Sequence, residues 1–178
     1  MLLCPLPADA QVYDIDPDHS SIHFVISHLG YSMIRGRFNS FHGRFEYDEK
    51  NPEAANTQVV VDTKSIDTNH AKRDIHLRSV EFLDVSHFPT ATFQSVSFKQ
   101  TSDKEGIITG NLTLHGITRP MDVRVTIIGS GPDPWGGQRR GYEGKMSINR
   151  SDFGMTKNIG SSSETLIVEL AIEGVVRR

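Results

Sequence analysis

The feature that most constrains the fold of this chain is an alternation of apolar and polar residues with a period of two. From Ser20 onward this alternation dominates, and turn residues interrupt it at regular intervals. Ile22, Phe24 and Ile26 belong to the first expected strand, and this strand ends near Gly30. Because successive side chains of a β-strand point to opposite faces, the pattern predicts short strands in a sandwich or barrel.

The spacing of the turns predicts about eight strands. After the first, they are expected in residues 38–47, 59–63, 91–99, 107–115, 121–128, 142–149 and 166–176. Eight is the number at which a closed barrel can just hold side chains or one small ligand. The short link from His115 to Thr118 leaves no room for a crossover helix, so we expect an antiparallel meander. Gly36 and Gly43 are expected at bends or bulges.

Length and charge limit the classes of protein that fit. The chain has 178 residues, enough for one domain with its own core, which we place at residues 11–178. No apolar run approaches the roughly 20 residues of a membrane-spanning helix. The net charge is −3 and the basic residues are scattered among acidic ones, so nucleic acid is not an expected partner.

The N-terminus has the character of an export signal. The first ten residues, MLLCPLPADA, are apolar and end in Ala8-Asp9-Ala10, the small-x-small pattern that signal peptidase reads. We interpret residues 1–10 as the remnant of such a signal; the alternative is a disordered N-terminal stub. Cys4 is the single cysteine, so no intrachain disulfide can form.

Only residues 68–83 have a helical pattern. The candidate caps at its start are Asp67, Thr68 and Asn69. Asp74 and Arg78 lie one turn apart on this expected helix, so they are predicted to pair. We interpret the segment as an insertion between strands that can act as a lid.

The interior of the expected barrel is strongly apolar. Two strands carry large apolar residues at alternate positions: Met121, Val123, Val125 and Ile127 in one, and Leu166, Val168, Leu170 and Ile172 in the other. Phenylalanines cluster around the glycines and the helical insertion, and phenylalanine lines a tunnel as readily as it fills a core. The residues alone therefore leave a hollow and a filled barrel equally open.

Motifs of catalysis and metal binding are not found in the sequence. The eight histidines lack ligand spacing, and there is neither an H-E-x-x-H motif nor a G-x-S-x-G elbow. We therefore predict no catalytic residues, no metal site and no required cofactor. Trp135 lies in a Pro- and Gly-rich loop, where it could shield the barrel mouth or, as we favour, cap the edge of the core.

A series of short motifs runs in order from about Tyr13 to Val176. Among them are Asp18-His19-Ser20, His28-Leu29-Gly30-Tyr31-Ser32, Phe45-Glu46-Tyr47-Asp48, Thr68-Asn69-His70-Ala71, Phe88-Pro89, Leu112-Thr113-Leu114 and Asp152-Phe153. In these motifs the chain resembles the YceI-like family, lipocalin-like barrel proteins of bacterial periplasms that are associated with polyisoprenoid lipids. The resemblance implies an all-β, extended antiparallel eight-stranded barrel with a short helical insertion, and a periplasmic location.

The resemblance also implies a ligand, an isoprenoid of the quinone or polyprenyl type held in an apolar tunnel. The residues expected to line this tunnel are Phe24, Ile26, Leu29, Phe38, Phe41, Phe45, Ile75, Phe82, Phe88, Phe93, Ile148 and Phe153. The candidates to contact a polar head group are His28, Arg73, His76 and Arg78. Alternatively, Arg73, Asp74 and Arg78 form a salt-bridged network that only fixes the insertion.

Three functions are compatible with these observations. The leading hypothesis is non-enzymatic binding, transport or storage of a long isoprenoid. The alternative is an enzyme that acts on a lipid or quinone in the tunnel, with His28 or His76 as acid or base. A third is a filled barrel that serves protein contacts. A homodimer is possible because edge strands and exposed aromatic residues can pair.

Overall fold

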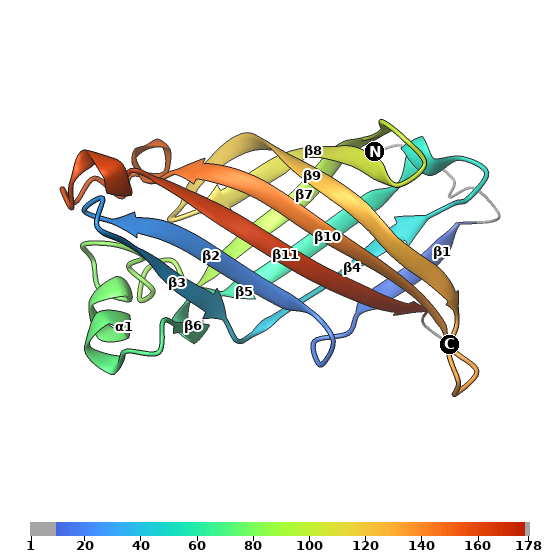
Figure 1. Ribbon diagram of the computed structural model, residues 1–178, viewed down its shortest axis with the longest axis horizontal. Helices are drawn as coiled ribbons and strands as arrows, with labels where there is room; N and C mark the ends of the chain where they lie inside the picture. Colours follow the sequence, from blue (N-terminus) through green and yellow to red (C-terminus); the bar gives the residue numbers. More distant parts are fainter. Residues whose placement is uncertain (1–9, 177–178) are drawn as a thin grey trace.

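The structure, a computed structural model, describes residues 10–176 and is an elongated barrel with a short helix at one end (Figure 1). The expected export-signal remnant, residues 1–10, falls almost entirely outside the described residues. Within the described part, no helix has the length and apolar character needed to span a membrane.

Eleven strands form one sheet. They are β1 (Gln11–Ile15), β2 (Ser21–His28), β3 (Ser32–Phe38), β4 (Phe41–Tyr47), β5 (Asn56–Asp62), β6 (Ile66–Asp67), β7 (Thr90–Gln100), β8 (Glu105–Leu114), β9 (Ile117–Pro132), β10 (Gln138–Asn149) and β11 (Thr165–Val176). One α-helix, α1 (Ala71–Leu77), lies in the described chain. Short 3-10 helices lie at Pro52–Ala54, Thr63–Ser65, Arg150–Phe153 and Ser161–Ser163.

Eight of these strands close into a ring. In order they are β1, β4, β5, β7, β8, β9, β10 and β11, and every neighbouring pair is antiparallel. The ring closes where Tyr13 of β1 lies opposite Val176 of β11. The sequence prediction of an eight-stranded antiparallel barrel is confirmed, but β1, which was not predicted, takes the place in the ring that was expected for the strand at residues 22–30. The pairing of β1 with β4 also departs from the expected meander.

The remaining strands lengthen the wall beyond the ring. β2 pairs with the same edge of β11 that β1 uses, but at residues 166–171. β3 pairs with β2, and the two-residue β6 pairs with the end of β3. At this end the β2–β3 hairpin therefore forms one side of the wall, with α1 beside it (Figure 1).

The expected tight link between β8 and β9 is present. His115 and Gly116 have φ values of 51° and 73°, and Leu114 lies opposite Ile117. Two consecutive positive φ values define the turn type whose twist matches a hairpin. This link holds the two strands antiparallel, as predicted.

The expected alternation decides which side chains face inward. Val123 and Val125 are buried, whereas Asp122 and Arg124 between them are exposed. The glycine prediction needs correction, because the register shifts lie at Ser95/Ser97 and Gly141/Tyr142 rather than at Gly36 or Gly43.

Gly36 and Gly43 serve close packing instead. A Cβ atom at Gly36 would lie 2.3 Å from the ring of Phe24, and one at Gly43 would lie 2.3 Å from the carbonyl oxygen of Gln58. Glycine in a strand often marks such an approach of a ring or a neighbouring backbone.

The predicted helix of residues 68–83 is too long. Helix α1 has seven residues, and its cap is His70, whose Nδ1 accepts a hydrogen bond from the backbone N–H of Arg73 at 3.2 Å. Beyond Leu77 the chain turns, and the hydroxyl of Ser79 donates to the carbonyl of His76 at 2.7 Å. Such local side-chain bonds compete with helix continuation.

The predicted pairing of Asp74 with Arg78 is wrong. The buried Asp74 carboxylate accepts from the backbone N–H and the hydroxyl of Thr68, at 2.9 and 2.5 Å. The guanidinium of Arg78 donates to the carbonyls of Lys64 and Ile66 at 2.8 and 2.6 Å. Both side chains therefore tie α1 to the preceding segment, where buried or unpaired backbone groups need partners.

The prediction for Trp135 is also wrong. Its side chain is 76% exposed in the β9–β10 turn, and the guanidinium of Arg139 lies 5.6 Å from its ring centroid. Asp133 orders this turn by accepting from the backbone N–H groups of Trp135 and Gly137. Because these contacts fix the loop, Trp135 neither shields a mouth nor caps the core.

Candidate functional site

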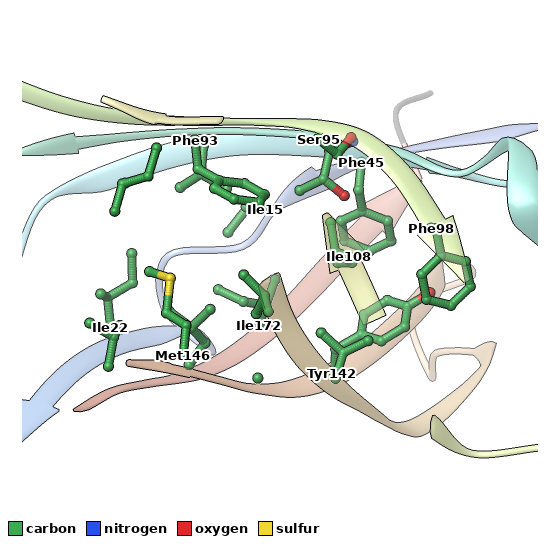
Figure 2. A pocket seen from close by; sticks show the side chains of 18 of the residues that line it. Ile15, Ile22, Phe45, Phe93, Ser95, Phe98, Ile108, Tyr142, Met146 and Ile172 are labelled. Carbon is green, nitrogen blue, oxygen red and sulfur yellow. The ribbon is translucent and has the colours of Figure 1, made fainter. Parts of the chain in front are cut away.

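Two apolar cavities lie inside the barrel, as formed by the residues that the structure describes. The inner cavity, of about 140 Å³, lies within the closed ring of strands. Figure 2 shows Phe45, Phe98 and Tyr142 toward one end of it and Ile22 and Met146 at the other. The outer cavity, of about 420 Å³, is bounded by the β2–β3 hairpin, α1 and the segment that joins β10 to β11. Since packed protein interiors contain few voids larger than a water molecule, the barrel is hollow rather than filled.

The two cavities share part of their walls. The residues that line both, which we call the waist, are Ile22, Val61, Ala91, Leu112, Met146 and Val168. All six are apolar, so the wall that the two cavities share is apolar. We refer to the two cavities together as the tunnel.

The inward face of β10 runs the length of this tunnel. It consists of Tyr142, Gly144, Met146 and Ile148, which line the cavities, preceded by Arg140 and followed by Arg150. The two arginines are ten residues apart, which corresponds to about 33 Å of extended strand. A buried guanidinium therefore stands at each end of a long apolar space.

Aromatic rings close the inner end. Tyr13 stacks on Phe45 with 4.9 Å between ring centroids, and Phe45 meets Tyr142 edge to face at 5.4 Å. Such pairs stabilise a core beyond their buried area. Burial raises the pKa of Tyr142, so its hydroxyl remains protonated at neutral pH.

Arg140 lies behind these rings and is only 3% exposed. Its guanidinium carbon lies 3.8 Å from the ring centroid of Tyr47, and one of its terminal nitrogens donates to the carboxylate of the exposed Glu49. Burial alone would lower the pKa of Arg140, but the bond to Glu49 raises it, so the side chain stays charged. Its Nε has no partner among the described residues.

The outer end is framed by the tip of the β2–β3 hairpin and by α1. His28 and Leu29 line the outer cavity from the hairpin, and Arg73 and His76 line it from the helix. Leu29 has a φ of 53°, in the left-handed region that leucine rarely adopts. This conformation costs on the order of 1 kcal/mol and persists only where the surroundings impose it.

Residues 150–164, which we call the strap, close the outer cavity from the third side. Arg150 anchors the strap, since its guanidinium donates to the carbonyls of Ser163 at 2.8 Å, Met155 at 3.0 Å and Lys157 at 3.3 Å. It also bonds to Glu164 at 3.3 Å. Arg150 is 4% exposed, so these contacts replace the water that the charge has lost.

The strap is tied to both neighbours across the opening. The hydroxyl of Ser163 donates to the carbonyl of Ser27 at 2.7 Å, which holds the strap to the hairpin. On the other side Glu81 accepts from Lys157 of the strap and contacts Nε2 of His76 at 2.5 Å. These two partners lower the pKa of Glu81, so it stays ionised and the bridge holds at neutral pH.

Most of the predicted wall residues line the tunnel. Phe45 and Phe93 lie in the inner cavity. The outer cavity contains six more: Phe24, Ile26, Leu29, Phe38, Phe82 and Ile148. Ligand binding by these residues stays a prediction.

Four predicted wall residues lie elsewhere. Ile75 is 67% exposed on the solvent face of α1, and Phe41 packs into the core without reaching either cavity. Phe88 packs edge to face on His115 at 4.7 Å, against the β8–β9 turn. Phe153 is 1% exposed within the strap, and its carbonyl lies 3.0 Å from Nδ1 of His115. The three phenylalanines pack segments of the chain against one another. Amino-acid composition cannot distinguish a phenylalanine with this role from one that lines a tunnel.

Three of the four head-group candidates lie at the outer cavity: His28, Arg73 and His76. Arg78 does not, because its guanidinium is turned toward the backbone of residues 64–66. Sequence reasoning missed Arg140 and Arg150, although both continue the period-two series of β10. It also missed Met155 and Ile159 of the strap, for which the sequence contains no periodic signal.

One further polar cluster lies outside the tunnel. Asp16, His19 and Glu173 offer ligand atoms within 4.8 Å of one another, the spacing of a metal site. Arg139 already bonds to Asp16 at 2.8 Å and to the carboxylate of Glu173. The guanidinium therefore supplies the positive charge that these carboxylates need, and the cluster closes the β1–β11–β10 corner.

Comparisons with known proteins agree with this architecture. The sequence profile of the YceI-like domain matches residues 13–174. A UPF0312 protein of Pseudomonas aeruginosa is 49% identical over 170 residues, which are 94% of this chain and 88% of the relative.

Two solved structures have the same fold. The crystal structure of Burkholderia cenocepacia BcnA superposes with a TM-score of 0.78 at 20% identity, over 92% of this chain and 99% of that one. A polyisoprenoid-binding domain from Saccharophagus degradans, implicated in plant cell wall breakdown, has a TM-score of 0.71 at 17% identity, over 94% and 99%. With a profile match across nearly the whole chain and a relative at 49% identity, this chain belongs to the YceI-like family.

Proposed function

We propose that this protein binds one long-chain isoprenoid lipid, of the quinone or polyprenyl type, inside the barrel and carries or stores it without chemical change. The observation that carries the proposal is the pair of apolar cavities inside the barrel that share the waist as a common wall. The outer cavity alone, at about 420 Å³, is within the size range of ligand sites.

The energetics favour a long, narrow occupant. Removing apolar area from water contributes about 25 cal/mol per Å², so a ligand that fills a tube along its length gains affinity with few polar contacts. A compact ligand would occupy one cavity and leave the other empty. The polyisoprenoid-binding domain of Saccharophagus degradans, which has the same fold, supports an isoprenoid as the chain.

The head group of the ligand is proposed to lie at the outer end. His28, Arg73 and His76 face that cavity and can donate to an oxygen of a quinone or a phosphate. The guanidinium of Arg73 also bonds to the hydroxyl and the carbonyl of Thr68, both at 2.7 Å, which fixes its position. At the inner end Arg140 is already paired with Glu49 behind aromatic rings, which suits the apolar tail.

The role is proposed to be non-enzymatic and periplasmic. His76 contacts Glu81 in the bridge to the strap, which supports a structural use of that histidine. The proposed periplasmic location rests on the small-x-small pattern near the N-terminus.

Native mass spectrometry of the freshly purified full chain, followed by organic extraction and lipid identification, tests this proposal. We expect one isoprenoid per chain, recovered chemically unchanged. A protein that arrives empty and also fails to take up added ubiquinone and polyprenol would contradict it, and conversion of an added lipid would favour an enzyme.

A further inference from the structure

Exposed apolar side chains are unevenly spread over the described surface. Eight large apolar residues are exposed, and five of them lie on the segments around the outer cavity. These five, which we call the apolar rim, are Leu29, Tyr31, Met33, Ile75 and Val80. Tyr31 is 87% exposed and Val80 is 73% exposed, so neither supports the core. The other three are Val96, Ile128 and Trp135 on the strands and turns of the barrel.

The rim lies on segments that border the outer cavity. Leu29, Tyr31 and Met33 lie at the tip of the β2–β3 hairpin, Ile75 is on α1, and Val80 is in the turn that follows the helix. These segments lie together at one end of the molecule (Figure 1). Leu29 belongs both to the rim and to the wall of the outer cavity, so the exposed apolar surface continues into the tunnel.

The backbone conformation at Leu29 is a second observation that points to a function for the apolar tip of the hairpin. Leu29 and Gly30 both have positive φ values, 53° and 81°. Asparagine or glycine adopts the first of these at less strain, and either would complete the turn. A leucine there keeps an apolar side chain half exposed at the mouth, which turn formation does not require.

The hairpin is also cationic within an acidic chain. From Ser21 to Phe38 the hairpin contains no aspartate or glutamate, but it contains Arg35 and Arg37, whereas the net charge of the whole chain is −3. Arg35 and Arg37 form ion pairs with Glu169 and Asp67 at 4.0 and 3.6 Å, and both arginine side chains remain more than half exposed. On α1, Lys72 is exposed, whereas Asp74 is buried and hydrogen-bonded to Thr68.

We propose that the outer end docks on the surface of an anionic phospholipid bilayer, with the apolar rim inserted so that the tunnel opens onto lipid rather than water. An apolar rim with cations beside it matches the acyl chains and phosphates of such a surface. A second copy of this chain on the same face would set these cations against one another, because a twofold contact pairs a surface with itself. The inference that docking lets the ligand enter rests on the proposed function. The geometry of the rim is independent of it.

Flotation of lipid-free protein with vesicles tests the proposal. The vesicles contain phosphatidylglycerol and phosphatidylcholine in equal parts, or phosphatidylcholine alone. The rim variant carries Tyr31→Ser and Met33→Ser, and the control carries Ile128→Ser and Trp135→Ser, which remove comparable exposed apolar side chains away from the mouth. We expect the wild type and the control to bind the anionic vesicles equally, and the rim variant to lose about tenfold in partitioning.

Three results would overturn docking: wild-type protein that does not float, equal flotation on both kinds of vesicle, or equal loss in the control and rim variants. Thermal unfolding checks that all variants are folded, which we expect because the replaced side chains are exposed.

A second readout separates docking from lipid binding. Transfer of a polyprenol from anionic vesicles should slow about tenfold in the rim variant, whereas uptake of the same polyprenol from detergent should not change. Protein that floats but takes up no isoprenoid would refute the proposed function and leave docking intact. If all variants take up isoprenoid from vesicles at the same rate, docking is refuted and the proposed function is left intact.

Discussion

Arg140 and Arg150 stand at the two ends of the inward face of β10, and their surroundings differ. Arg150 donates to the backbone carbonyls of the strap and holds a segment that bounds the larger cavity. Arg140 lies against the ring of Tyr47, has Glu49 as its carboxylate partner and leaves its Nε without a partner among the described residues.

The two ends also differ in how they are closed, and this difference indicates which of them can open. The inner end is closed by aromatic rings stacked within the ring of strands, which cannot separate without breaking the barrel. The outer end is closed by a helix of seven residues and by the strap, which contains no β-strand and is held by polar contacts and by the buried side chains of Phe153 and Met155. Segments outside a closed ring of strands open at lower free energy than the ring itself, so the ligand is expected to enter at the outer end.

The largest expected effect comes from blocking the waist between the two ends. Ala91→Phe places a ring where both cavities meet, so it should lower the affinity for a long isoprenoid at least about a hundredfold. A short isoprenoid that fits the outer cavity alone should still bind, which shows that the variant is folded. Titration of both lipids by native mass spectrometry measures the difference.

The matched control is Ala171→Phe, because Ala171 is exposed on β11 and the added ring points away from the tunnel. Binding of both lipids should be unchanged. If Ala91→Phe reduces short and long lipids equally, the two cavities do not act as one tunnel.

The second effect compares the two buried arginines. Arg150→Met leaves three backbone carbonyls of the strap without their donor and should reduce the free energy of unfolding by about 3 kcal/mol. Arg140→Met removes a charge with an unpaired Nε and leaves Glu49 free to be hydrated, so the loss should be below about 1 kcal/mol. Urea unfolding measures both. Equal losses would mean that the two ends are fixed equally strongly.

A third, smaller effect distinguishes where the head group binds. His28→Leu should weaken binding of a quinone-bearing isoprenoid about fivefold, the value of one hydrogen bond, and leave the matching hydrocarbon chain unaffected. Tyr142→Phe removes a hydroxyl at the inner end and should change neither ligand. The reverse result would place the head group at the inner end.

The smallest effect is a pH dependence of the outer end. The pKa of Glu81 is lowered from its ordinary value of 4.5 by hydrogen bonds from Lys157 and His76. A lowered carboxyl pKa stabilises the fold fully above the ordinary value, and this contribution is lost as the pH falls through the lowered value. Amide exchange in residues 157–161 should therefore quicken in acid relative to its intrinsic rate, and stay slow at pH 6.

Glu81→Gln should show the faster exchange at both pH values, whereas Glu143→Gln on the outer face of β10 should behave as wild type. Exchange in the strap that does not respond to either acid or Glu81→Gln would show that Arg150 alone holds it.

Sequence patterning predicted the ring of strands better than the segments that close it. The period-two series in β9 and β11 fixes which side chains face inward, and the His115-Gly116 turn follows from local conformational preference. Whether the interior is hollow could not be predicted, because a filled barrel needs the same alternation. The cavity depends on how side chains from opposite walls meet, which is a property of the closed ring.

The errors are concentrated at the outer end for the same reason. The helix ends at Leu77, because Ser79 bonds to the backbone and Phe82 and Leu83 are buried, so tertiary contacts override helical propensity. Phe88 and Phe153 pack near His115, a contact between distant segments. Arg140 and Arg150 could have been found, since both continue the inward series of β10.

A crystal structure of the protein loaded with a long isoprenoid that carries bromine on its head group tests the central claim most directly. The account predicts one continuous chain of density from Phe98 at the inner end, past Ala91 and Met146 at the waist, to Leu29 at the outer end, with the bromine signal beside His28 and Arg73. Density confined to one cavity, or bromine beside Tyr142, would contradict it.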